Sequence, residues 1–178
     1  MLLLDRFDRK GPHRVGYISA MTLLEAQDGQ PRDYTEIAEV LPENSSAAVE
    51  DLRQLWRRIA FSIAIHNTDD HLRNHGFLRL GSGWRLAPAF DVNPNPELAA
   101  QRVTSVGGAT RPADEVNALL VYAESFGLAD EQARVILREV AEAVENWDSI
   151  ARRNGITQAE IARFEPTLSH TINAVRLG

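Results

Sequence analysis

The side chains of this chain that are best suited to chemistry lie in one short polar segment, from Ile65 to Leu78. The segment holds two carboxylates, two carboxamides, three histidines and one arginine. Asp69 is followed five residues later by Asn74, and a further acid, Asp91, comes after the segment. Carboxylate and carboxamide oxygens can orient a hydroxyl group, and they are the hard ligands that Mg²⁺ prefers. The segment therefore predicts a site where acidic groups and a divalent cation act together.

The order of these residues is that of a phosphoryl-transfer site. An acid, an asparagine five residues later, a hairpin and a second acid form the layout of a kinase catalytic loop and its metal-binding acid. In this interpretation Asp69 orients the acceptor hydroxyl, and Asn74 and Asp91 supply oxygens to Mg²⁺. His71 and Arg73 lie between them in sequence, where they could contact phosphate or brace the loop.

The same residues allow plainer interpretations, which the sequence leaves open. Three acids could act only as helix caps or turn residues: Asp69, Asp70 and Asp91. Four side chains could instead form a metal cluster, although their spacing matches no zinc motif: His66, Asp70, His71 and His75.

A buried helix before the polar segment and a hairpin after it should position these groups. Apolar residues recur at helical spacing from Val49 to Ile63, which predicts a helix that ends near Ile65. Asn44, Ser45 or Ser46 could cap its start. Strands over 76–80 and 84–87, joined at Gly81-Ser82-Gly83, would then return Asp91 to the side of Asn74.

The remaining sequence predicts an α+β domain that is mainly α-helical. Strands are expected over 1–7 and 14–18, with a turn at Gly11-Pro12 between them. Ser19 could cap a helix to about residue 27, and a helix over 34–41 should stop at Pro42. Three further helices are expected: one from 112 to Gly127, one over 131–152, and one opened by a capping box of Thr157 and Glu160, which Pro166 could kink.

Composition narrows the class of protein. A chain of 178 residues favours one domain, here 1–178, and its net charge of -6 argues against nucleic acid as a direct partner. It has no cysteine, which excludes disulfides and weakly favours the cytoplasm, and it has no apolar run long enough for a membrane helix. Lys10 is the only lysine and no glycine-rich phosphate loop adjoins it, so the nucleotide-binding half of a kinase is missing.

Three segments carry a resemblance to a known family: Asp5-Arg6-Phe7-Asp8-Arg9, residues 67–74 and residues 84–91. Together they resemble the HipA-like serine/threonine kinases, the toxins of bacterial type II toxin–antitoxin pairs. The resemblance covers nearly the whole chain but only the C-terminal lobe of the family. It implies a protein-kinase-like lobe in which short β-hairpins carry the catalytic and metal-binding loops, with ATP and Mg²⁺ as cofactors.

The resemblance also implies roles for particular residues. Asp69 would be the catalytic aspartate with His71 beside it in the catalytic loop, and Asn74 and Asp91 would bind Mg²⁺. Residues 5–7, including Asp5 and Phe7, would form the hinge beside adenine, and Arg73 would contact the nucleotide. Asp5 stands where the family often has glutamate.

The same resemblance implies partner proteins for this chain, and it shows where the chain differs from the family. Such kinases phosphorylate proteins, with aminoacyl-tRNA synthetases as typical substrates, and pair with a helix-turn-helix antitoxin, so nucleic acid would be reached only through that antitoxin. The family's N-terminal lobe has no counterpart in this sequence, so a fragment, a truncated product or one part of a split kinase is expected. Two alternatives stay open: an inactive remnant that binds the antitoxin, and a small-molecule phosphotransferase.

Overall fold

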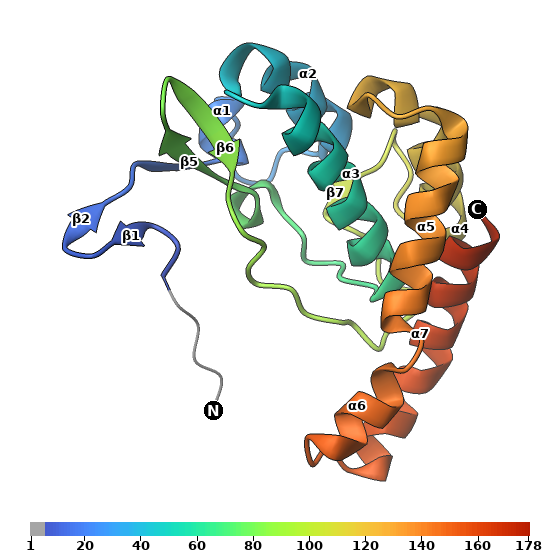
Figure 1. Cartoon of the computed structure of the whole chain (residues 1–178). Coiled ribbons are helices and arrows are strands. Elements are labelled where there is room, and N and C mark those ends of the chain that lie inside the picture. The colour runs from blue at the N-terminus through green and yellow to red at the C-terminus, as the bar shows by residue number, and fades with distance from the viewer. Residues whose placement is uncertain (1–5) are drawn as a thin grey trace.

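The computed structural model describes residues 6–178 as a helical body with small sheets at one end (Figure 1). Its helices are α1 (Ala20–Leu23), α2 (Tyr34–Asn44), α3 (Ala48–Ala64), α4 (Pro112–Val121), α5 (Asp130–Val144), α6 (Trp147–Arg153) and α7 (Gln158–Leu177). Its strands are β1 (Arg9–Lys10), β2 (His13–Arg14), β3 (Tyr17–Ser19), β4 (Arg32–Asp33), β5 (Gly76–Leu80), β6 (Gly83–Leu86) and β7 (Thr104–Ser105). The expected mixture of helices and small sheets is confirmed.

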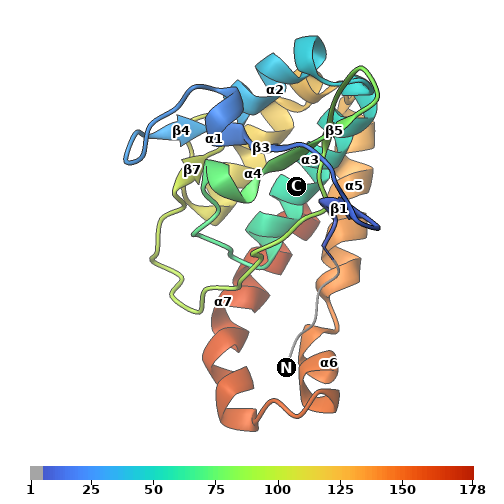
Figure 2. The same ribbon diagram turned by 90° about the vertical axis from the view of Figure 1, so that its left-hand side faces the viewer.

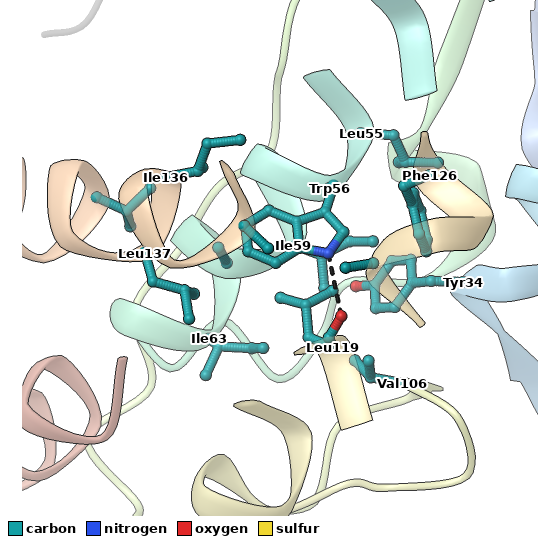
Figure 3. Close-up of a cluster of buried hydrophobic side chains, with 14 of the residues drawn as sticks. Tyr34, Leu55, Trp56, Ile59, Ile63, Val106, Leu119, Phe126, Ile136 and Leu137 are labelled. Atoms are coloured by element: carbon teal, nitrogen blue, oxygen red, sulfur yellow. Dashed lines mark hydrogen bonds between the residues drawn. The ribbon is translucent and has the colours of Figure 1, made fainter. Parts of the chain in front are cut away.

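Helix α3 is the centre of the core, and α2, α4, α5 and α7 pack around it. Its apolar stripe is buried as predicted, except that Val49 at its first turn is 60% exposed. Trp56 is fully buried among residues from α3, α4 and α5 (Figure 3). Its indole Nε1 donates a hydrogen bond to the carbonyl oxygen of Leu119, 3.1 Å away, near the end of α4. This satisfies a carbonyl that a helix end leaves without an intrahelical partner.

Two small sheets hold the polar segment from different sides. Strands β3, β5 and β6 form an antiparallel sheet in which Ile18 lies opposite Phe77 and Leu78 lies opposite Arg85. Strands β4 and β7 pair in parallel, which joins Arg32 to Thr104 across a large separation in sequence. The hairpin that follows the polar segment, with its turn at Gly81, is thus confirmed.

The N-terminal expectations were only partly correct. Residues 1–5 lie outside the described part of the chain, and Arg6 and Phe7 are not in a strand. Gly11-Pro12 does form a turn, but it joins β1 to β2. The predicted return strand over 14–18 is wrong, because β3 pairs with β5 after the polar segment and not with the N-terminal residues.

Three helices, α1, α2 and α3, begin or end at residues other than those predicted. Helix α1 is capped by Ser19 but already ends at Leu23. Helix α2 continues past Pro42, because the Asn44 side chain donates to the carbonyl oxygen of Val40 at 2.8 Å and supports the last turn. Helix α3 starts after Ala47, whose N–H is bound by the Ser45 hydroxyl at 3.0 Å.

The C-terminal helices also depart from the prediction. Helix α4 ends at Val121, and a tight 3-10 turn leads to Gly127, whose φ of +69° ends that turn. The long helix expected over 131–152 is wrong, because α5 ends at Val144 and a separate α6 follows, with no buried residue to continue the apolar stripe of α5. The capping box of Thr157 and Glu160 is confirmed, and Pro166 lies inside α7.

Figure 2 shows that α6 and the first turns of α7 extend away from the sheets, at the opposite end of the helical body. Among residues 6–178, no helix combines the length and the apolar character that a membrane crossing requires.

Trp56 gives a test of the core. Replacing it in Trp56→Phe leaves a small void and removes the donor to the Leu119 carbonyl. We expect the free energy of unfolding to fall by about 2–3 kcal/mol, measured by urea denaturation. Trp147→Phe, at a half-buried tryptophan, is the matched control and should change it by less than about 1 kcal/mol. Equal effects of the two substitutions would contradict the central position of Trp56.

Candidate functional site

The polar segment begins at a sharp turn directly after α3. His66 has a φ of +53°, a left-handed conformation that is uncommon for residues other than glycine. The turn is fixed by backbone bonds from His66 N to Ile63 O at 3.0 Å and from Asn67 N to Ser62 O at 2.9 Å. The imidazole Nε2 lies 3.0 Å from the carbonyl oxygen of Glu97. Burial lowers the pKa of His66, so its neutral form is favoured near neutral pH.

A buried arginine, Arg102, stabilises this turn through hydrogen bonds. The Arg102 guanidinium donates to the Asn67 carbonyl at 2.6 Å, to the Ser62 hydroxyl at 2.7 Å and to the Glu115 carboxylate at 2.6 Å. The side chains of Arg102 and Glu115 are each only 1% exposed, so this is a fully buried ion pair. Burial opposes the charge of Arg102, but nearby Tyr34 and Glu115 outweigh it and raise the pKa of Arg102 above its usual value.

Asp70 is a second buried anchor. Its carboxylate accepts hydrogen bonds from the Tyr34 hydroxyl at 2.6 Å and the Ser62 hydroxyl at 2.8 Å, and His75 Nε2 lies 3.0 Å from its other oxygen. Burial by itself would raise the pKa of Asp70. The attraction and hydrogen bonding of His75, together with the two hydroxyl donors, overcome that effect and hold the pKa well below its ordinary range. Asp70 therefore stays ionised and ties the loop to α2 and α3.

Asp69, the neighbour of Asp70, faces the opposite way. It is exposed, and it lines a small pocket of about 220 Å³ that Asp91 and Asn93 also line. Asp91 has a φ of +53°, and its carboxylate accepts a hydrogen bond from the Asn93 side chain at 2.9 Å. Two carboxylates from separate segments thus share one pocket. The sequence predicted that the hairpin would bring Asp91 beside Asn74, and Asn74 is not among the residues that line this pocket.

Asn74 lies behind this pocket and does not line it. It is largely buried at the end of a 3-10 turn over Leu72–Asn74, and its Nδ2 donates to the carbonyl oxygen of Asp69 at 3.1 Å. Its Oδ1 accepts no hydrogen bond within residues 6–178, so the amide oxygen has capacity for another partner. The Asn74 side chain therefore helps to fix the position of the Asp69 backbone.

His71 and Arg73 face a different pocket. They line a cavity of about 350 Å³ together with Met21 and Asp28, and the Arg73 guanidinium forms an ion pair with the Asp28 carboxylate. This cavity and the pocket of Asp69 and Asp91 have no lining residue in common. The roles predicted for His71 and Arg73 in catalysis and nucleotide binding stay predictions.

Phe7, near the start of the described chain, lies close to Phe90, the residue before Asp91. The ring centroid of Phe7 lies 5.8 Å from that of Phe90 and 6.2 Å from that of Tyr17. Phe7 is thereby placed beside the segment that carries Asp91. Asp5, which was predicted to line the adenine site with Phe7, lies outside the described residues.

The three histidines of the polar segment occupy separate environments, at Glu97, at Asp70 and in the Arg73 cavity. Across the described range 6–178, no group of three or more histidine, aspartate or glutamate side chains converges as a metal site would require. The pocket of Asp69 and Asp91 is instead the point where carboxylates from two segments meet.

Sequence reasoning missed the residues that support the loop: Tyr34, Ser62, Arg102 and Glu115. Two of them carried a weak signal. Ser62 falls between buried positions of the α3 stripe, and Glu115 precedes Val116 on the buried side of α4. A polar residue on an apolar face must find a partner when it is buried. Arg102 gave no such signal, because it stands in a loop and its partners are distant in sequence.

Comparisons with known proteins show the family and the fold of this chain. Residues 1–147 match the family described as "HipA-like C-terminal domain". A Haemophilus influenzae protein named "Putative kinase" is 30% identical over 110 residues, which cover 54% of this chain and 32% of that protein. The fold resembles that of HipA from Shewanella oneidensis MR-1, solved with HipB and operator DNA, with a TM-score of 0.71 and 16% identity. That match covers 97% of this chain and 46% of the longer one.

Acid titration should reveal the role of Asp70. Because its pKa in the folded state lies below the value of about 3.9 in an unfolded chain, its charge stabilises the fold above that pH. This contribution is lost as the pH falls through the folded pKa. We expect Asp70→Asn to lower the free energy of unfolding by about 1–3 kcal/mol at pH 7, and the difference to shrink below about pH 4. Asp69→Asn, at the exposed neighbour, should follow the unmodified protein at every pH.

The buried ion pair makes a second prediction. Arg102→Met leaves Glu115 buried without its partner and frees the Asn67 carbonyl, so we expect a loss of about 3–5 kcal/mol in chemical denaturation. The double substitution with Glu115→Leu removes both charges and should recover part of that loss. A double variant as unstable as the sum of two independent losses would show that the pair is not coupled.

Proposed function

The chain belongs to the family of HipA-like C-terminal domains, and on this premise we propose that it is the C-terminal lobe of a serine/threonine protein kinase. The lobe would transfer the γ-phosphate of ATP to a protein hydroxyl when an N-terminal lobe completes the nucleotide site. The observation that carries the proposal is the shared pocket of Asp69 and Asp91, which places an acid from the polar segment beside an acid from the region after the hairpin.

The residues of this pocket suit phosphoryl transfer in different ways. Asp69 is exposed and its carboxylate accepts no hydrogen bond within residues 6–178, so it can accept one from a substrate hydroxyl and orient it. For Mg²⁺ we propose two protein donors, the Asp91 carboxylate in the pocket and the amide oxygen of Asn74, whose side chain would have to turn toward the pocket because it does not line it in this structure. The ion would neutralise charge on the phosphates. Asp70 and Arg102 would act as positioning residues that hold the backbone of Asp69 in place.

The lobe alone is a part of the relatives it matches, since it spans 32% of the Haemophilus protein and 46% of the Shewanella HipA chain. Phosphate-binding groups would therefore come from a further lobe, with Phe7 beside the adenine as part of the hinge. Because the Shewanella protein was solved with HipB and operator DNA, we also propose a helix-turn-helix antitoxin as partner, through which DNA would be reached. The phosphate acceptor would be a protein such as an aminoacyl-tRNA synthetase.

One observation favours a second candidate, an inactive module that only binds an antitoxin. Lys10 is the only lysine of the chain, and it lies in the β1–β2 hairpin and not in the pocket of Asp69 and Asp91. The chain itself thus offers no lysine to nucleotide phosphates at that pocket. Detectable ATP binding that depends on Mg²⁺ would separate the two candidates.

Calorimetric titration with ATP and Mg²⁺ tests the proposal directly. We expect Asp91→Asn to weaken Mg²⁺-dependent binding by at least about tenfold, because the carboxylate that faces the metal is lost. Asp69→Asn should leave binding within about twofold, while it slows phosphate transfer in a protein completed by an N-terminal lobe by about 10²–10⁴-fold. Asp114→Asn, an exposed acid on α4, is the matched control. Transfer that is unchanged by Asp69→Asn would refute the catalytic role.

A further inference from the structure

A further cavity of the described chain lies away from the pocket of Asp69 and Asp91. It has a volume of about 830 Å³ and lies between α3, α5 and the segment that leaves β6. Figure 1 shows α3 and α5 side by side with β6 close to the start of α3. Its volume falls within the range of about 300–1,000 Å³ that is typical of binding sites. No residue lines both this cavity and the pocket of Asp69 and Asp91.

Four arginines mark one side of this cavity, which we call the arginine groove: Arg53, Arg57 and Arg58 from α3, and Arg85 from β6. Two of them already have partners. Arg57 pairs with Glu139 at 2.7 Å, and Arg85 pairs with Glu50 at 2.9 Å and Asp51 at 3.2 Å. Within residues 6–178, Arg53 and Arg58 form no ion pair and donate no hydrogen bond. The groove therefore presents two guanidinium groups whose charge is not neutralised by a direct contact.

Of the two unpaired arginines, Arg58 gives the stronger indication that the groove binds an anion. It is half-buried, and burial lowers its pKa, although the charges of Asp51 and Asp70 oppose that effect. A guanidinium that has lost part of its hydration without gaining a direct partner interacts strongly with an anion that reaches it. Arg53 precedes Arg58 by five residues on α3; it also lines the groove, and it is exposed to solvent. The two groups are thus placed for more than one anionic contact along a single ligand.

The other side of the groove carries apolar side chains together with two polar residues of α5, Glu131 and Gln132. Leu86 and Pro88 come from the segment after the hairpin, Leu128 precedes α5, and Val135 and Ile136 belong to α5. Val135 is 40% exposed although it lies on a helix whose other apolar residues are buried. A partly exposed apolar wall that faces unpaired arginines matches a ligand with carboxylates on one edge and apolar side chains on the other.

We propose that the arginine groove binds an acidic peptide segment of a protein partner, with glutamate or aspartate side chains on Arg53 and Arg58 and apolar side chains against Val135. Charge complementarity selects this occupant. The lining holds four arginines against three acids, Glu50, Asp51 and Glu131, and the first two of these acids are already bound to Arg85. Arg53 and Arg58 therefore leave unpaired positive charge at the groove, on a chain whose net charge is -6. Arginine binds carboxylates through two parallel hydrogen bonds, which favours side-chain carboxylates over a diffuse contact. The inference is independent of catalysis at Asp69.

A peptide titration tests this proposal on the whole chain. The probe is a fluorescein-labelled octapeptide of alternating glutamate and leucine, and the reading is fluorescence anisotropy. We expect binding that weakens by at least about tenfold when every glutamate is replaced by glutamine or when salt is raised to about 0.5 M. Arg53→Glu should raise the Kd by about tenfold or more, and Val135→Asp should also raise it by placing a like charge beside the peptide.

Two controls separate the groove from general effects of charge. Arg138→Glu reverses an exposed arginine of α5 that does not line the groove, and it should change the Kd by less than about twofold. Asp91→Asn should leave peptide binding unchanged while it abolishes Mg²⁺-dependent ATP binding, so the two proposals can fail separately.

Three outcomes would overturn the inference. The first is equal binding of the glutamate and glutamine peptides, or no binding of either. The second is an equal loss in Arg138→Glu and Arg53→Glu, which would reflect net charge alone. The third is displacement of the peptide by ATP with Mg²⁺ in a way that Arg53→Glu weakens, which would make the groove a nucleotide site.

Discussion

The fold depends on one constraint, the burial of a charged pair beneath the polar loop. Arg102 and Glu115 are almost entirely removed from water, and a buried charge without partners would cost several kcal/mol. Arg102 offsets this cost by binding the Glu115 carboxylate and also the Ser62 hydroxyl and the carbonyl of Asn67 at the end of α3. The turn at His66 is therefore the conformation that allows the ion pair to be buried at all.

The same constraint explains the different roles of two neighbouring acids. Asp70 points inward to Tyr34 and Ser62, and it shares Ser62 with Arg102, so the two buried charges of opposite sign stabilise one another. Asp69 is exposed between two buried residues, Thr68 and Asp70, and the Asn74 side chain donates a hydrogen bond to its carbonyl oxygen. A fixed, exposed carboxylate is thus a direct result of the packing below it.

The sequence predicted the elements that depend on local pattern. The apolar period of α3, the glycine turn of the β5–β6 hairpin and the capping box at Thr157 were visible because each signal lies within a few residues. The hairpin also led to the prediction that Asp91 would return to the polar segment, but the prediction named Asn74 as its neighbour, and the residue that shares its pocket is Asp69. The β4–β7 pair and the contacts of Arg102 were not predictable, because their partners lie tens of residues away in the sequence. The break after α5 was not predictable either, because it depends on where the apolar residues of the helix no longer pack against another element.

The separation between Asp69 and Asp70 has an evolutionary consequence. Asp69 carries no folding interaction through its side chain, so a descendant can lose it at little cost in stability. Replacing Asp70 or Arg102 costs more stability, because each forms several buried hydrogen bonds that hold the loop. A relative that had lost Asp69 would keep the shape of the loop, because Asp70, and not Asp69, binds Tyr34 and Ser62. The conformation of the loop therefore reports on stability alone, while Asp69 and Asp91 are the positions on which the proposed phosphoryl transfer depends.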